Sequence, residues 1–183
     1  MDKLRCVLIV LLTGVPLLAV AVDERRLSES ETAVTVDGVI DAGEYSIEYE
    51  TRGLRLFLSR DASQLFAAVT ANTRGWVAIG FGSTMMNGAH ILLSYVTDGT
   101  AHVVEQKGVE FHGHEDTEET VVTGYAVVES GSGTVLETSV ALDALATMIE
   151  ENGSKLGVII AYATRDSLRV KHRARGSLNV ILE

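Results

Sequence analysis

The sequence predicts an all-β domain, folded as an antiparallel sandwich or barrel with one short helix. Three observations lead to this fold class. Apolar and polar residues alternate over short stretches, turn residues separate these stretches at intervals of roughly 8–12 residues, and only one stretch has helical spacing. At 183 residues, the chain suits a single domain that buries a sizeable core without disulfides.

The N-terminal stretch has the pattern of an export signal. Lys3 and Arg5 precede an apolar run over residues 6–21, which contains Pro16 and ends in the small-residue pattern AVA. This run is short for a membrane span, which needs about 20 apolar residues. We therefore predict a secretory signal peptide over residues 1–21, with an uncleaved anchor as the alternative. The protein is expected to be exported, periplasmic or extracellular, with no stable membrane span after cleavage.

Composition excludes several classes of function for the exported chain. The formal net charge is −10, and nucleic-acid phosphates would repel so acidic a protein. The only cysteine is Cys6, which lies inside the predicted signal. Without it, the chain cannot form a disulfide, an iron–sulfur cluster or the C-x-x-C-H attachment of a c-type haem. Any redox cofactor would therefore be held without a covalent bond.

The predicted elements begin after a charged stretch. Residues 22–32 predict a flexible lead-in, and the domain itself is predicted over residues 33–183. Residues 76–81 and 89–95 are the most continuously apolar, which predicts central strands buried on both faces, and residues 142–149 predict the helix. The other strands are predicted near residues 34–36, 45–49, 54–58, 65–71, 102–104, 121–127, 136–140, 156–163 and 178–182.

Two residues far apart in the chain suggest redox chemistry. Met86 lies in a glycine-punctuated turn between the two central strands, and His172 lies just before the last strand. A thioether and an imidazole are neutral ligands that fill both faces of a haem iron, and the soft sulfur favours the ferrous state. An iron whose two faces are both filled has no coordination position for a substrate. Such a site would transfer electrons, and the protein would not be an enzyme. The plainer alternatives are a gap-filling core methionine and a solvated histidine.

An ordered series of motifs resembles the DOMON domain family, in its bacterial type. The series consists of DGVIDAGEY at residues 37–45, GWVAIGFG at 75–82, MNGA at 86–89 and the pattern H-x-x-R-G at 172–176. The resemblance implies an immunoglobulin-like antiparallel β-sandwich. In b-type cytochrome members, such as the cytochrome domain of cellobiose dehydrogenase, it further implies a non-covalent haem b. Carried over by motif, the iron ligands are Met86 and His172, with Met85 as the rival of Met86.

Other residues are candidates for the surroundings of the cofactor. Trp76 is a candidate stacking partner, with a place in the core as the favoured alternative. Gly80 and Gly82 would let a flat macrocycle approach the backbone, or they serve only the adjoining turn. Five basic residues near His172 are candidates to meet the haem propionates, or they form an ordinary charged strand edge. They are Arg165, Arg169, Lys171, Arg173 and Arg175.

Residues 108–119 predict a long acidic loop that carries two histidines. Imidazole together with carboxylate suits zinc or copper, so this loop is a candidate metal site. Its spacing matches no known site, which favours a flexible acidic loop instead. The candidate ligands are His112, His114, Glu110, Glu115 and Asp116. His90 and His102 lie in or beside strands and are expected to be structural.

The predicted function is therefore an exported b-type cytochrome domain that passes electrons to a redox partner protein. The acidic surface predicts a basic docking face on that partner, because opposite potentials speed transient encounters. The alternative is a carbohydrate-binding module on the same fold. Sugar sites present flat aromatic platforms, and this chain has one tryptophan and only 5% aromatic residues.

Overall fold

The structure is a computed structural model that describes residues 22–110, 113–151 and 155–183. The predicted signal peptide and His112 lie outside the described residues. Within the described ranges, no helix is long and apolar enough to cross a membrane.

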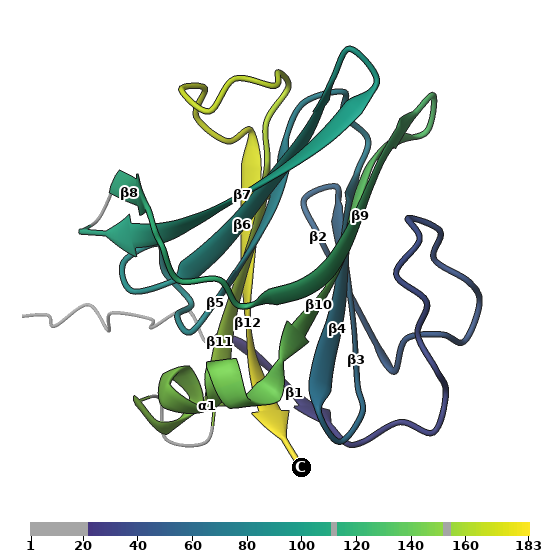
Figure 1. Ribbon diagram of the computed structural model, residues 1–183, viewed down its shortest axis with the longest axis vertical. Coiled ribbons are helices and arrows are strands. Elements are labelled where there is room, and N and C mark those ends of the chain that lie inside the picture. The colour runs from purple at the N-terminus through teal and green to yellow at the C-terminus, as the bar shows by residue number, and fades with distance from the viewer. Residues whose placement is uncertain (1–21, 111–112, 152–154) are drawn as a thin grey trace, which may run out of the picture.

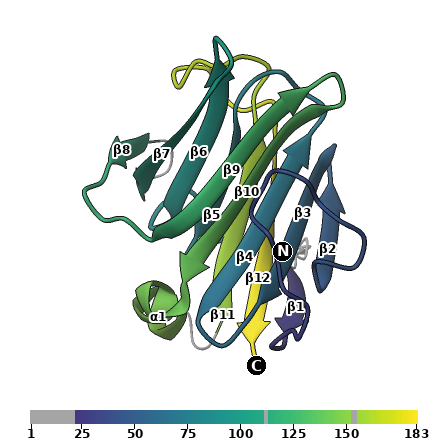
Figure 2. The same cartoon turned by 45° about the vertical axis from the view of Figure 1, so that its right-hand side comes forward.

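Two sheets lie face to face and form the predicted all-β sandwich (Figures 1 and 2). The larger sheet has seven strands, and the smaller sheet has five. The order in the larger sheet is β1 (Asp23–Leu27), β12 (Ala174–Leu182), β11 (Lys155–Tyr162), β5 (Val77–Phe81), β6 (His90–Thr97), β7 (Thr100–Val109) and β8 (Gly113–Asp116). The order in the smaller sheet is β2 (Ile47–Thr51), β3 (Leu54–Arg60), β4 (Gln64–Ala71), β10 (Gly133–Ala141) and β9 (Val122–Ser130).

β5 is buried along its whole length, as the continuous apolar run predicts. Because side chains alternate between the faces of a strand, β5 contributes to two separate cores. Val77, Ile79 and Phe81 point into the main core between the sheets. Ala78 belongs to a smaller apolar cluster on the other side, together with Trp76. The larger sheet therefore has a second covered face, outside the sandwich core.

The helix α1 (Leu142–Glu151) forms where helical spacing predicts it. Leu145 is fully buried in the main core. The Met148 side chain packs against Gly82, where an added Cβ would lie 3.2 Å from the Met148 sulfur. Gly82 also has a φ of +93°, which favours glycine. Glycine at position 82 thus allows both the turn after β5 and the close packing of α1.

Regular structure begins earlier in the chain than predicted. Residues 23–27 form the strand β1, whereas the sequence predicted a flexible lead-in there. β1 pairs parallel with β12, with Asp23 opposite Leu178 and Leu27 opposite Leu182. Leu27 is fully buried, whereas the four residues before it are exposed. The strand is held mainly by backbone hydrogen bonds at the edge of a sheet. Such pairing does not require apolar and polar residues to alternate. The charged composition of this stretch therefore led to the wrong prediction of a flexible lead-in.

Two other local predictions are wrong. Residues 34–36 form no strand and belong to a long segment before β2. Within residues 108–119, β7 continues to Val109, and β8 pairs with it, with His114 opposite Gly108. Charged side chains are typical of a sheet edge, where they discourage pairing with other chains. The acidic run therefore marks an edge strand as well as the loops around it.

Candidate functional site

The outer face of the larger sheet holds a cavity of about 340 Å³. Its floor is apolar and comes from the central strands, with Ala78 of β5, Ile91 and Leu93 of β6 and Ile159 of β11. Residues 168–172, from the loop between β11 and β12, form the opposite part of the lining. A mainly apolar cavity of this size, with a few polar groups, is typical of a ligand or cofactor site.

Met86 enters the cavity from the turn between β5 and β6. Gly108 of β7 fixes this turn, since its N–H donates to the Ala89 carbonyl at 2.8 Å and its carbonyl accepts from Gly88 N–H at 3.0 Å. A Cβ at Gly108 would lie 1.6 Å from the Met86 carbonyl oxygen, so the turn can approach β7 only over a glycine. Met85 is 61% exposed and does not line this cavity.

His172 enters the cavity from the loop before β12 and is half-buried. The neighbouring backbone is fixed, because Arg173 N–H donates to the Tyr162 carbonyl at 2.6 Å. Burial lowers the pKa of His172 below its ordinary value, and the positive charges of Arg175 and Lys171 act in the same direction. A lowered pKa favours the neutral imidazole, which is the form that binds metals.

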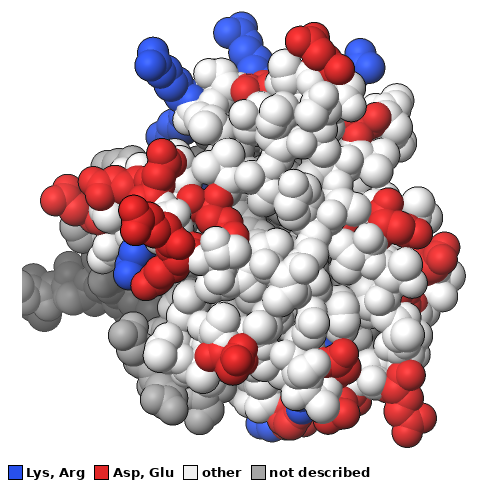
Figure 3. Space-filling view, in the orientation of Figure 1, with Lys and Arg blue, Asp and Glu red and all other residues white. Residues whose placement is uncertain are grey.

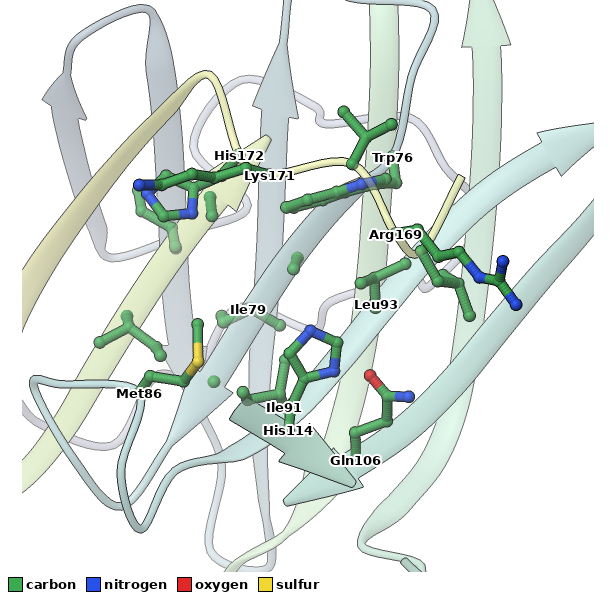
Figure 4. Close-up of a pocket in the computed structure, with 17 residues that line it drawn as sticks. Trp76, Ile79, Met86, Ile91, Leu93, Gln106, His114, Arg169, Lys171 and His172 are labelled. Atoms are coloured by element: carbon green, nitrogen blue, oxygen red, sulfur yellow. The ribbon is translucent and has the colours of Figure 1, made fainter. Parts of the chain in front are cut away.

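Met86 and His172 approach the cavity from opposite sides (Figure 4). In this view Met86 lies on the lower side with its side chain directed upward, and His172 lies on the upper side. Both residues also line a second hollow of about 510 Å³. Met86 and His172 therefore lie where the cavity meets the second hollow.

Of the other residues that the sequence suggested for the site, only some line the cavity. Trp76 lines the cavity and is only 6% exposed, so it belongs both to the outer apolar cluster and to the site. Gly82 does not line the cavity, whereas Gly80 does. The Ile159 side chain occupies the space beside Gly80, since a Cβ added to Gly80 would lie 2.7 Å from that side chain.

The five candidate cations divide into three groups. Arg169 and Lys171 line the cavity, and Arg175 lines the second hollow. Arg165 and Arg173 line neither, so the structure does not place Arg173 as the sequence suggested. All five side chains are exposed, and within the described residues none of them forms an ion pair.

Two polar residues of the cavity were missed as parts of this site. Gln106 of β7 and His114 of β8 line it beside the apolar residues. Gln106 Oε1, His114 Nδ1 and Trp76 Nε1 are buried and have no hydrogen-bond partner. The available signal was the alternation of residues along the edge strand β8 and its neighbour β7, but the pairing of these two strands was not predicted.

The remaining described histidines lie outside the cavity and contact neighbouring side chains. His90 is 2% exposed, and its Nε2 lies 2.7 Å from the Glu105 carboxylate. His102 stacks on Tyr95, with ring centroids 4.9 Å apart. Across the described ranges, no three His, Cys, Asp or Glu side chains are grouped so that they could hold a metal ion.

Comparison with solved structures gives several similar folds. The cytochrome domain of cellobiose dehydrogenase from Myriococcum thermophilum has a TM-score of 0.51 and 10% identity, over 75% of this chain and 81% of that one. The cytochrome b domain of pyranose dehydrogenase from Coprinopsis cinerea has a TM-score of 0.53 and 9% identity, over 74% and 80%. A family 9 carbohydrate-binding module from Caldicellulosiruptor kristjanssonii has a TM-score of 0.50 and 14% identity, over 88% and 94%.

These similarities establish a shared fold at low sequence identity. No family model matches the chain, and no curated protein matches it. The neighbours include both cytochrome b domains and a carbohydrate-binding module, so the fold is compatible with either function.

Proposed function

We propose that this domain is an exported, DOMON-type b cytochrome domain, in which Met86 and His172 hold the iron of a non-covalently bound haem b. The observation that carries the proposal is that these two side chains, far apart in the sequence, face one cavity from opposite sides (Figure 4). Their order and motif context match the DOMON resemblance. The likeness in fold to two cytochrome b domains supports the same function.

The residues present fit a haem. The donor set is one thioether and one imidazole, and the lowered pKa of His172 keeps the imidazole in its neutral form. Ile91, Leu93 and Ile159 provide an apolar floor that excludes water. Bound haem would supply the exchange of one electron between ferrous and ferric iron.

The cations at the cavity have a role in this proposal. Lys171 and Arg169 line it and, with Arg175 at the adjoining hollow, are available to the two haem propionates. The positive charges of Arg175 and Lys171 also disfavour protonation of His172. The same residues would therefore bind the acidic edge of the cofactor and keep the ligand neutral.

The charge around the cavity changes the expectation for a redox partner. The net charge of −10 predicts a basic docking face on the partner. However, positive side chains gather at the end of the molecule where residues 163–173 lie (Figure 3). Electrons pass most readily where the partner comes close to the cofactor. For a partner that approaches over this loop, we propose an acidic docking face.

The test is haem binding by the protein that starts at residue 22. Titration with haemin should give a saturable Soret band, and reduction should give the sharp α-band of a low-spin haem. Saturation at one haem per chain is the expected result. A folded protein that stays colourless with excess haemin would exclude the proposal.

A second candidate function is carbohydrate binding at the same cavity. The specific observation in its favour is that Trp76 lines the cavity and that its Nε1 has no hydrogen-bond partner. An indole face with a free N–H can stack on a sugar and donate to a hydroxyl. Saturable glycan binding that Met86→Ala leaves unchanged, in a protein that binds no haem, would favour this function.

A further inference from the structure

His114 lies on the same wall of the cavity as Met86. It is directly opposite Gly108 in the pairing of β8 with β7. Gly108 is also the residue against which the Met86 backbone packs, because the carbonyl oxygen of Met86 occupies the place of its missing Cβ. Residues directly opposite in antiparallel strands have Cα atoms about 4.5–5.5 Å apart. Met86 and His114 thus flank one glycine, and both line the cavity.

The ring of His114 has a buried nitrogen without a partner. Its Nδ1 forms no hydrogen bond, and neither does Oε1 of Gln106. The two residues are diagonal neighbours on one face of β7 and β8, because Gln106 is opposite Asp116 and Gly108 is opposite His114. Leaving a buried polar group without a hydrogen-bond partner is energetically unfavourable. A site with two such groups side by side is therefore more stable with a ligand or a rearrangement that engages them.

A hydrogen bond from His114 to Gln106 would select the tautomer that binds metal through Nε2. The amide nitrogen of Gln106 donates to Asp116 Oδ1 at 2.8 Å, which leaves Oε1 as the acceptor toward its other neighbours. A small side-chain adjustment would let His114 Nδ1–H donate to Oε1. The lone pair would then reside on Nε2, as in metal-binding histidines whose other nitrogen donates to an oxygen.

The close-up shows how the side chains lie around the cavity (Figure 4). Met86 and His114 lie along the lower side of the cavity, and His172 and Trp76 lie along the upper side. His114 therefore approaches from the side of Met86 and not from the side of His172. An imidazole in that position would compete with the thioether of Met86 for the iron and would leave His172 in place.

We propose that His114 is a second iron ligand of this chain, which binds opposite His172 whenever Met86 does not. The inference rests on the proposed haem function and adds to it a reserve ligand. A pair of imidazoles lacks the soft sulfur that favours ferrous iron, so the exchange lowers the reduction potential. Loss of Met86 as a ligand would convert the domain to a lower-potential cytochrome without leaving an open position on its iron.

The experiment compares four proteins reconstituted with haemin: the unmodified protein, Met86→Ala, Met86→Ala with His114→Gln, and Met86→Ala with His102→Ala. The last is the matched control, because His102, on the neighbouring strand β7, is an imidazole that does not line the cavity. Ferric and ferrous spectra report the spin state, and a redox titration reports the potential. His114→Gln keeps a polar side chain on β8, and circular dichroism checks the fold of every variant.

The expected result is a low-spin iron in Met86→Ala, with a lower potential than in the unmodified protein, and the same in the His102 control. The variant that also lacks His114 should be high-spin, and added imidazole should restore its low-spin spectrum. A high-spin iron in Met86→Ala alone, in a protein whose unmodified form is low-spin, would overturn this inference and leave the proposed function intact. Failure of the unmodified protein to bind haem would overturn both.

Discussion

The Tyr45 hydroxyl donates a hydrogen bond to the carboxylate of Glu137, in the middle of β10. That carboxylate is fully buried and also accepts from the backbone N–H groups of Asp37, at 2.9 Å, and Gly38, at 2.7 Å. Gly38 is required for this approach, because an added Cβ would lie 2.4 Å from the Val128 side chain. One acidic residue therefore ties the motif at residues 37–45 to the smaller sheet.

Glu137→Ala should destabilise the fold strongly. The substitution leaves the buried N–H of Gly38, the part-buried N–H of Asp37 and the Tyr45 hydroxyl without their acceptor. Hydrogen bonds to charged groups contribute about 1.5–3 kcal/mol each, and the losses are only partly additive, so we expect a decrease in the free energy of unfolding of about 3 kcal/mol. Urea unfolding measures it. Glu50→Gln, at an exposed position of β2, is the control and should have almost no effect.

The same carboxylate should also affect how stability depends on pH. Burial raises the pKa of Glu137 above 4.5, although hydrogen bonds from Tyr45, Gly38 and Asp37 oppose the shift. Between 4.5 and the raised value, the folded state binds more protons than the unfolded state, so the contribution of Glu137 to stability decreases as pH rises through this window. Glu137→Gln should remove this negative slope. Unfolding free energies measured at a series of pH values check the sign, and an unchanged slope would contradict it.

The two methionines of the turn should differ in their effect on haem. Met85→Ala should leave the spectrum and the potential unchanged, because Met85 is exposed and does not line the cavity. His172→Ala should lose most haem or leave a high-spin iron, since Met86 and His114 both approach from the other side. Spectra and haem content of the two variants provide the measurement. An altered spectrum in Met85→Ala, or an unchanged one in His172→Ala, would show that the ligands are wrongly assigned.

Gly108→Ala should displace the Met86 turn. The new Cβ would collide with the Met86 carbonyl, and neither backbone can move without breaking the hydrogen bonds that Gly108 makes to Gly88 and Ala89. We expect a loss of at least about 2 kcal/mol in stability, as for other forced overpacking, together with a changed haem spectrum. The matched control is Gly131→Ala, where nothing lies within 4 Å of the added Cβ. Equal behaviour of the two variants would contradict the assigned packing.

Charge reversal on the loop that adjoins the cavity should slow electron exchange with an acidic partner. Arg169 and Lys171 are exposed and line the cavity, so Arg169→Glu with Lys171→Glu places negative charge at the proposed docking face. The rate with an acidic redox protein should fall, and the fall should diminish with added salt. Arg55→Glu, on β3 of the other sheet, is the control. An unchanged rate with the acidic protein, together with a faster rate of the double variant with a basic redox protein, would instead support the basic partner that net charge predicts.

The sequence by itself determined the all-β class, the helix, and the two central strands, because alternation and continuous apolar runs report burial directly. Motif and donor chemistry suggest Met86 and His172 as a ligand pair, and the structure places both residues at one cavity. Only the tertiary structure revealed that His114 and Gln106 share that cavity, that Gly82 serves α1, and that residues 23–27 form an edge strand. These features depend on which strands become neighbours. Backbone pairing at a sheet edge and contacts between distant segments leave no periodic pattern in the residues that make them.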